Sequence, residues 1–300
     1  MTGQNIIITG ATSGIGEVTA VAIAKTGAKT IIISRSEAKC QKAVANIKSA
    51  SGNQDVHYLV ADLSSIAATR AVAQAYKTQF DRLDVLINNA GGLFNERRES
   101  VDGYEMNVAL NHIGPFVLTM ELLELLKQTA SQNPAFGARI VNVSSSQHSN
   151  GIKWDNLMSE KRYSQFNTYG QSKAMTNMFT FELARRLEGS GVTVNALTPG
   201  RVKTNILKKD GKNLLTTVIG FLAQFFFVTP EQGAETSIYL ATSDKVAGVS
   251  GKYFAKKQEK TAHKSSLNPQ DWARLWAQTE AWVSKGSVAS ISNHNGISSD

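Results

Sequence analysis

The chain has 300 residues, 42% of them hydrophobic, and a net charge of +8 at pH 7. This length fits one large α/β domain or two small ones, and the apolar content suffices for a sizeable core. Because Cys40 is the single cysteine, an intrachain disulfide and a cysteine-based zinc cluster are excluded. With no such ligand cluster we expect no metal site, and because the basic residues are scattered without a run of five, we expect no nucleic-acid partner.

Segments typical of strands and helices alternate along the chain. A strand at 5–9, a glycine-rich turn, a helix at 17–25 and a strand at 29–34 form one βαβ unit. Further strands are expected at 57–61, 85–88, 139–144, 193–198 and 252–254, and further helices at 36–50, 66–80, 102–126, 168–188 and 230–242. This alternation predicts a single α/β domain of the Rossmann type, with a doubly wound parallel sheet covered on both faces.

The two ends of the chain carry expectations of their own. No signal peptide and no apolar stretch of about 18 residues stands out, so we expect a cytoplasmic protein. Residues 286–300 are rich in Ser, Asn and Gly, and we expect this tail to be disordered beyond a domain that spans 1–285.

The turn after the first strand predicts a dinucleotide site. Gly10, Gly14 and Gly16, with Ser13 and Ile15 between them, let the backbone approach a pyrophosphate. The helix that follows offers free N–H groups and a favourable dipole to the same group. The alternative is a glycine-rich turn that serves only tight packing.

The ends of the second and third strands indicate which nucleotide binds. An NAD site would place an acidic residue after the second strand, where this chain has Arg35 between two serines. Because a guanidinium suits a 2′-phosphate, we predict NADP(H); the alternative is that Arg35 is a solvated loop residue. Asp62, followed by Leu63, is predicted to accept a hydrogen bond from the adenine amino group, or else to cap the next helix.

Tyr169 and Lys173 are the candidate proton donor and its partner. At a spacing of four they lie on one face of a helix, one turn apart. A cation held close lowers the pKa of a phenol, so the pair is suited to acid–base catalysis. Such a pair also occurs on many solvated helices, and its weight comes from the motifs around it.

Taken together, the motifs resemble those of the short-chain dehydrogenases/reductases over about residues 3–285. The resemblance rests on Asn111 and on five runs in the family's order: TGATSGIG at 9–16, NNAG at 88–91, VNVSS at 141–145, YGQSK at 169–173 and PG at 199–200. The segments NHIGPFVLT at 111–119 and ELARRLEGSGVTVNALTPGRVKTN at 182–205, and the Trp-rich end at 271–283, are similar to the retinol dehydrogenase branch.

The resemblance implies an activity and a class of substrate. Members of that branch mostly use NADP(H) on retinoids, steroids or other lipophilic aldehydes and ketones. We therefore expect an oxidoreductase that acts as a carbonyl reductase or alcohol dehydrogenase on a small lipophilic carbonyl or alcohol. Many members carry an N-terminal membrane anchor; this chain begins directly at its first strand, which puts membrane residence and a retinoid substrate in doubt.

The resemblance also assigns roles to residues. Tyr169 would donate the proton to the carbonyl oxygen, Lys173 would lower its pKa and hold the nicotinamide ribose, and Ser145 would hydrogen-bond the substrate oxygen. Asn111 would hold a water in a proton relay to Lys173. Alternatively, serines 144–146 merely cap a strand end and Asn111 satisfies backbone inside its helix. Further cofactor contacts are implied at Asn89, Ala90, Gly91, Pro199, Gly200, Val202 and Thr204.

Residues 206–228 lie where the family varies its substrate-binding lid. The run at 214–228 is apolar and aromatic, which suits a lipophilic ligand, packing onto the core or a partner, or peripheral membrane contact beside Lys208, Lys209 and Lys212. His112 and His148 are expected to be structural. Family members often pair through the helices expected at 102–126 and 168–188, so we also expect a homodimer.

Two rival functions fit the same fold. The first is an NADPH-binding sensor with little catalysis, which the complete set of Asn111, Ser145, Tyr169 and Lys173 argues against. The second is a photoenzyme similar to protochlorophyllide reductase, which light-dependent reduction of that pigment would reveal.

Overall fold

The computed structural model describes residues 1–147, 151–200 and 229–292, with backbone alone for 286–292. The strands are β1 Asn5–Thr9, β2 Lys29–Ser34, β3 Val56–Val60, β4 Val85–Asn88, β5 Ala138–Val143, β6 Val192–Thr198, β7 Lys252–Ala255 and β8 Gln258–Lys260. The main helices are α1 Gly14–Ala24, α2 Glu37–Ser51, α3 Ile66–Gln79, α4 Met106–Val108, α5 Gly114–Gln132, α6 Gln165–Arg186, α8 Pro230–Thr242 and α9 Pro269–Ser292, with a π-helical turn η1 at Ala109–Ile113.

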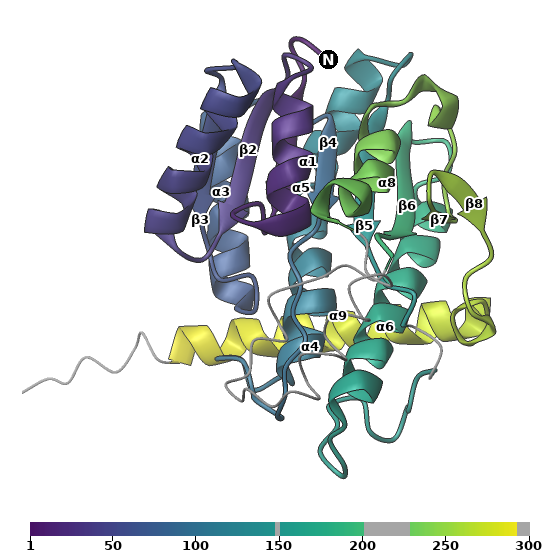
Figure 1. Ribbon diagram of the computed structural model, residues 1–300. Helices are drawn as coiled ribbons and strands as arrows, with labels where there is room; N and C mark the ends of the chain where they lie inside the picture. Colours follow the sequence, from purple (N-terminus) through teal and green to yellow (C-terminus); the bar gives the residue numbers. More distant parts are fainter. Residues whose placement is uncertain (148–150, 201–228, 293–300) are drawn as a thin grey trace, which may run out of the picture.

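The eight strands form one sheet in the order β3-β2-β1-β4-β5-β6-β7-β8 (Figure 1). Strands β1 to β7 pair in parallel, which confirms the predicted doubly wound α/β fold. β1 lies between β2 and β4, so the direction of winding reverses there. In sheets of this kind ligands bind beyond the carboxyl ends of the strands at that reversal.

The strand β8 was not predicted, and it is antiparallel to β7. The two strands are joined by Lys256 and Lys257, whose φ angles of 51° and 62° fit a two-residue hairpin turn. The sequence did not indicate this hairpin because the turn has no Asn-Gly or Asp-Gly pair and β8 is exposed throughout.

Both faces of the sheet are buried, and alternate strand residues serve different layers. Ile6, Ile8 and Ile32 pack in the layer of α1, α2 and α8, whereas Ile7 and Ile31 pack in the layer of α3, α5 and α6. All five side chains are fully buried. This pattern is what a parallel strand with helices on both sides requires.

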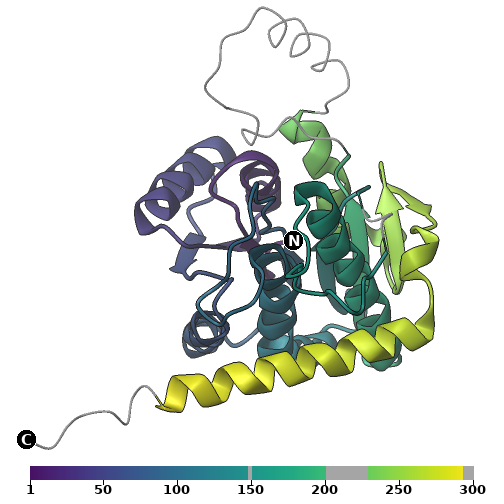
Figure 2. The ribbon, with the colours of Figure 1, turned by 90° about the horizontal axis from the view of Figure 1, so that it is seen from below.

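The long helix α9 lies across the layer formed by α3, α5 and α6 (Figures 1 and 2). Trp276 of α9 packs its ring 5.0 Å from that of Phe116 in α5 and 6.1 Å from that of Phe179 in α6. The helices expected to pair two copies of the chain are therefore covered by α9 on this side. A homodimer stays a prediction.

Helix α9 also reaches further than the sequence predicted. It continues to Ser292, through the start of the tail that was expected to be disordered from 286. The physical reason is that extending an established helix costs little, and the single Gly286 weakens it by only about 1 kcal/mol. Residues 293–300 lie outside the described residues.

The helix predicted at 102–126 is wrong at both ends. It begins at Met106, passes through η1 and ends at Gln132. Residues before it form a turn closed by Ser100 N–H donating to Tyr104 O at 2.7 Å, and Glu105 caps the helix by accepting from Val108 N–H at 3.0 Å. Asp102, where the predicted helix begins, instead accepts from Ile66 N–H at the start of α3, at 2.9 Å.

One described helical stretch, Met106–Gln132, is long and apolar enough to span a membrane by composition. In this fold, 72% of its apolar window is buried inside the protein. Its composition is accounted for by its place in the core between the sheet and α9.

Candidate active site

A groove of about 960 Å³ opens beyond the carboxyl ends of β1 to β4. It is lined by the turn after β1, by the first residues after β2 and β3, and by the loop after β4. The predicted residues that line it are Gly10, Ser13, Gly14, Ile15, Gly16, Arg35, Asp62, Leu63, Asn89, Ala90 and Gly91. The structure thus brings together segments that are up to about eighty residues apart in sequence, at the position expected for a dinucleotide.

The glycine turn is shaped by close backbone approach. Gly10 has φ +69°, and a Cβ there would lie 2.8 Å from Ala90 Cα. A Cβ on Gly16 would lie 2.5 Å from Gly10 O. Gly14, with φ +58°, has open space where its side chain would be, on the first residue of α1.

The first turn of α1 presents its N–H groups without a side-chain cap. Ser13 occupies the N-cap position in an extended conformation and its hydroxyl makes no cap hydrogen bond. Uncapped N–H groups and the helix dipole favour an anionic group at this point. The turn therefore fits the diphosphate of a nucleotide; close packing accounts for Gly10 and Gly16, and the positive φ accounts for Gly14.

Replacing Gly16 with alanine is expected to lower the free energy of unfolding by about 1–3 kcal/mol, because the new Cβ is forced against Gly10 O. Urea denaturation measures this loss. Gly52→Ala is the matched control, since a Cβ there meets nothing within 4 Å and only the cost of its φ of +76° remains. Equal losses in the two variants would contradict the close approach.

The groove end beyond β2 is cationic. Arg35 is exposed and lines the groove, and Lys39, in the first turn of α2, lines it too. Among the described lining residues Asp62 is the one acid. Lys39 was not predicted, although its place in the first turn of the helix that follows the second strand was a usable signal, because that turn lies next to the end of the strand.

Asp62 is not the cap of the next helix, so that alternative is wrong. Its Oδ1 accepts from the N–H and the hydroxyl of Ser64, at 3.0 and 2.7 Å. The N-cap of α3 is Ser65, which accepts from Ala68 N–H at 3.3 Å. Asp62 is exposed and turned to the groove, as its predicted contact with an adenine requires.

Tyr169, Ser145 and Lys173 meet at the start of α6. The side chains of Ser145 and Tyr169 are hydrogen-bonded, and Lys173 Nζ lies 5.8 Å from the centre of the Tyr169 ring. Lys173 Nζ donates to Val143 O at 2.9 Å. A Cβ on Gly91, which lines the groove, would be 3.3 Å from that nitrogen. Lys173 is thus placed against the loop after β4, although none of the three residues lines the groove itself.

Burial controls the proton affinities of this pair. Lys173 is 4% exposed, and burial lowers the pKa of its ammonium to about 8. Burial also raises the pKa of Tyr169 above its ordinary value, and the Ser145 hydrogen bond lowers it in part. The predicted net lowering of the Tyr169 pKa by Lys173 is therefore not found in this structure, because desolvation of the phenolate outweighs an ammonium at this distance.

Asn111 occupies the middle of the π-helical turn η1. Its side chain accepts from Gly92 N–H at 2.8 Å and donates to Gly92 O at 3.0 Å and to Ser172 Oγ at 2.9 Å. A Cβ on Gly91 would touch Asn111 Oδ1 at 3.0 Å. Asn111 Oδ1 and Lys173 Nζ therefore both lie against the position that a side chain of Gly91 would occupy. The backbone groups that the Asn111 side chain satisfies are those of Gly92, in the loop after β4, and not those of its own helix. This bonding is compatible with a catalytic role.

The serines after β5 have separate partners. Ser144 Oγ donates to Lys173 O at 3.1 Å and thereby ties β5 to α6. Ser145 Oγ accepts from Gln147 N–H at 3.1 Å in addition to its bond with Tyr169. Capping of the strand end and contact with the tyrosine are thus both present at Ser145.

The remaining predicted residues follow β6. Gly200 has φ +86°, and its N–H donates to Thr198 Oγ1 at 3.2 Å, so the chain turns directly after Pro199. Val202, Thr204, the expected lid at 206–228 and His148 lie outside the described residues.

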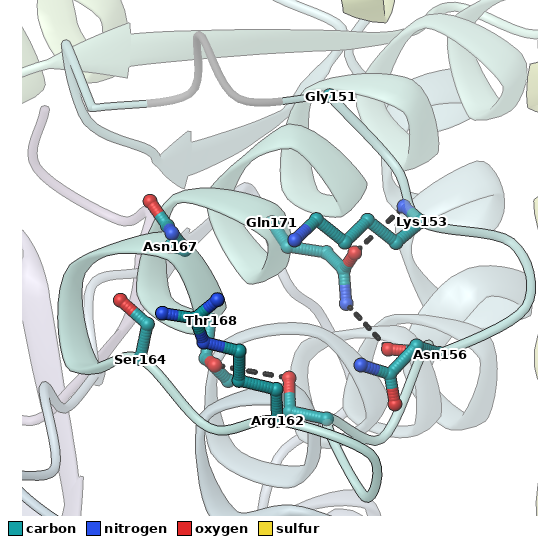
Figure 3. A pocket seen from close by; sticks show the side chains of 9 residues that line it. Gly151, Lys153, Asn156, Arg162, Ser164, Asn167, Thr168 and Gln171 are labelled. Carbon is teal, nitrogen blue, oxygen red and sulfur yellow. Dashed lines mark hydrogen bonds between the residues drawn. The ribbon is translucent and has the colours of Figure 1, made fainter.

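The end of the groove beyond the β4 loop is largely apolar, and the exposed Arg98, next to Met106, is the charged residue there. Leu93, Phe94, Met106 and Leu110 line it. Sequence analysis missed these residues because only the fold places α4 and η1 opposite the β4 loop. A separate cavity of about 200 Å³ lies at the start of α6 (Figure 3), with polar residues and Gly151 around it, and neither Tyr169 nor Lys173 lines it. Gln171 there accepts from Lys153 N–H at 2.8 Å and holds the loop before α6 in place.

Comparison with known protein families identifies the family of this chain. The model of the family described as short chain dehydrogenase matches residues 4–214. The chain belongs to this family. It is therefore an oxidoreductase acting on CH–OH or C=O groups.

Individual relatives place the chain in the retinol dehydrogenase branch. It is 39% identical to human retinol dehydrogenase 14, over 94% of this chain and 87% of that protein. It is 37% identical to human polyprenol dehydrogenase, over 91% of this chain and 83% of that protein. The structure of Pseudomonas aeruginosa RhlG with NADP superposes with a TM-score of 0.69 and 29% identity, over 85% of this chain and 94% of that one.

Proposed function

We propose that this dehydrogenase uses NADP(H) to interconvert a small lipophilic aldehyde or ketone and the corresponding alcohol. The observation that carries the proposal is that Ser145 and Tyr169 lie beside Lys173, whose Nζ is placed against Gly91 in the lining of the groove that the glycine turn opens. A proton donor close to a nucleotide cradle fits carbonyl reduction.

The chain's own residues fit a nicotinamide dinucleotide. Gly10, Gly14 and Gly16 with the free end of α1 would hold the diphosphate, Asp62 the adenine, and Arg35 with Lys39 a 2′-phosphate. When bound, the nicotinamide supplies or accepts the hydride. The NADP in the RhlG structure supports the choice of nucleotide.

Proton transfer is the part that the protein performs. Tyr169 is protonated at neutral pH, since burial raises the pKa of its hydroxyl, and it can donate to an oxygen that gains charge. Ser145, bonded to it, would hydrogen-bond the same oxygen. Lys173 and Asn111, which both lie against Gly91, would return the proton to Tyr169. These roles stay proposals.

The substrate class follows from the apolar end of the groove. Leu93, Phe94, Met106 and Leu110 exclude water and favour a hydrocarbon body over a sugar. The names retinol dehydrogenase and polyprenol dehydrogenase of the relatives support a lipophilic substrate. Cytoplasmic location and membrane contact through 214–228 stay predictions.

Replacing Arg35 with alanine is expected to weaken NADPH binding by about tenfold to a hundredfold, because a charge-assisted contact to the 2′-phosphate is lost. NADH affinity should change less than about twofold, since NADH has no such phosphate. Cofactor fluorescence titration measures both. Lys42→Ala, which removes an exposed α2 cation away from the groove, is the control. Equal affinity for the two nucleotides in the wild-type protein would contradict NADP(H) preference.

The sensor function is the rival that this titration also addresses. A sensor would bind NADPH tightly and turn over none of a panel of aliphatic, aromatic and isoprenoid carbonyls. The hydrogen bond between Ser145 and Tyr169 favours the enzyme, because nucleotide binding alone needs no proton donor beside the groove.

A further inference from the structure

Asn111 sits in a helical turn that needs support from its neighbours. In η1 the Gly114 N–H donates to Ala109 O, five residues back, in place of the usual four. Such π-helical turns are less stable than α-helix and are found mostly at functional sites. What holds η1 therefore decides where Asn111 lies.

One side of η1 is held by the catalytic helix α6. Thr176 Oγ1 donates to Asn111 O at 3.0 Å. The Asn111 amide donates to Ser172 Oγ, whose hydroxyl donates in turn to Tyr169 O at 2.8 Å. These bonds join the asparagine to the turn of α6 that carries the tyrosine.

The other side of η1 is held by α9, through the residue next to Asn111. His112 Nε2 lies 2.7 Å from Thr279 Oγ1, and both residues are buried, with exposed fractions of 1% and 0%. The Thr279 hydroxyl donates to Leu275 O at 2.8 Å, so it accepts from His112. The proton of the imidazole is thereby assigned to Nε2.

The bond to Thr279 is the hydrogen bond that orients the His112 ring among the described residues. Phe179 meets the imidazole edge-on, with ring centres 6.2 Å apart. His112 Nδ1 has no hydrogen-bond partner among the described residues. Because an unmade hydrogen bond is costly in such a place, the Thr279 contact holds the ring, and with it η1, in one position.

We propose that Thr279 and His112 are positioning residues, through which α9 fixes η1 so that the Asn111 side chain stays against Gly91, a residue of the groove lining. The C-terminal helix is thus part of the support of the catalytic site, in addition to covering α3, α5 and α6. This inference rests on the role proposed for Asn111.

Thr279→Val in the full-length protein tests the proposal. It keeps the shape of the side chain and removes the acceptor of His112. We expect kcat for carbonyl reduction with NADPH to fall about tenfold, because a displaced asparagine no longer serves the proton relay. KM and NADPH affinity should stay within about twofold, since no contact of the glycine turn changes. Hydrogen exchange of the amides at 109–114 should rise.

The double variant with Asn111→Ala separates positioning from mere destabilisation. If Thr279 acts through Asn111, Thr279→Val has less than about a twofold effect on kcat in that background. The same tenfold loss in both backgrounds would overturn the proposal. An unchanged kcat in Asn111→Ala alone would overturn the role of Asn111 itself, which is a different failure.

Two further variants secure the result if Thr279→Val folds poorly. Thr279→Ser keeps the hydroxyl and should keep kcat within about twofold of wild type; a loss as large as that expected for valine would show that packing matters and that the proposal is wrong. Ser284→Ala removes another hydroxyl from α9, on its exposed side where it donates to Glu280 O, and should change neither kcat nor exchange at 109–114.

Discussion

Replacing Tyr169 with phenylalanine is expected to lower kcat for carbonyl reduction by about a hundredfold to ten-thousandfold, since the hydroxyl that donates the proton is removed. The ring remains in α6 and the burial around it is unchanged, so NADPH affinity should stay within about twofold. Steady-state kinetics with a lipophilic aldehyde, together with fluorescence titration of NADPH, measure the two quantities separately.

The control for this variant is Tyr58→Phe. It removes a phenol hydroxyl on β3 that is bonded to the exposed side chains of Glu37 and Gln41, away from the groove. Its kcat should equal that of the wild type. A Tyr169→Phe protein with undiminished kcat would overturn the proposed proton donor, whereas loss of NADPH binding would show that the change had disturbed the fold of the site.

Lys173→Met is the second change with a large expected effect, and it acts on activity and stability in opposite directions. Activity should fall by at least about a hundredfold, because the charge beside Tyr169 and the group that returns its proton are lost. The free energy of unfolding should be unchanged or rise by about 1–2 kcal/mol, because a buried charge is replaced by an apolar chain of similar length. This net value includes the cost of leaving Val143 O without its hydrogen bond.

The pH dependence of the free energy of unfolding shows whether the buried charge of Lys173 destabilises the fold. Lys173 has a pKa of about 8 in the folded chain against 10.5 for a free lysine. Between these values the unfolded state binds the proton and the folded state does not, so the contribution of Lys173 to stability rises with pH across this window. The full difference amounts to roughly 3 kcal/mol.

The measurement is urea denaturation of wild type and Lys173→Met at several values between pH 7 and 10.5. The wild-type curve should approach the variant's curve as pH rises, since other groups titrate equally in both. A constant gap across the window would show that Lys173 is not held in the low-dielectric setting described. Lys42→Met, at an exposed site on α2, is the control and should show no such trend.

Part of the candidate site follows from sequence motifs, and part depends on the folded structure. The order of Gly10, Asn89, Ser145 and Tyr169 along the chain predicted a common site, because each follows a parallel strand and the carboxyl ends of such strands meet at one edge. Nothing in the spacing indicated Thr279, more than 160 residues from His112, since the contact depends on α9 lying across α5 and α6.

The placement of charges and of helix ends was also predictable only in part. Arg35 was predictable because the residue after β2 has a fixed place in the fold, whereas the direction of the Tyr169 pKa shift was wrong, since desolvation depends on how deeply packing buries the hydroxyl. Asp102 was predicted to begin its own helix and instead accepts from the first N–H of α3, because such a contact depends on which helix end comes near.

By itself the sequence determined the strand and helix alternation, the parallel sheet, the family and the positions of the cofactor turn and the Tyr169–Lys173 pair. These follow from local periodicity and from motifs whose chemistry is fixed by a few neighbouring residues. Only the tertiary structure decided the β8 hairpin, the π-helical turn at Asn111, the apolar end of the groove and the place of α9. These depend on contacts between segments far apart in the chain, and on burial, which sets both the cost of an unpaired polar group and the proton affinity of a buried one.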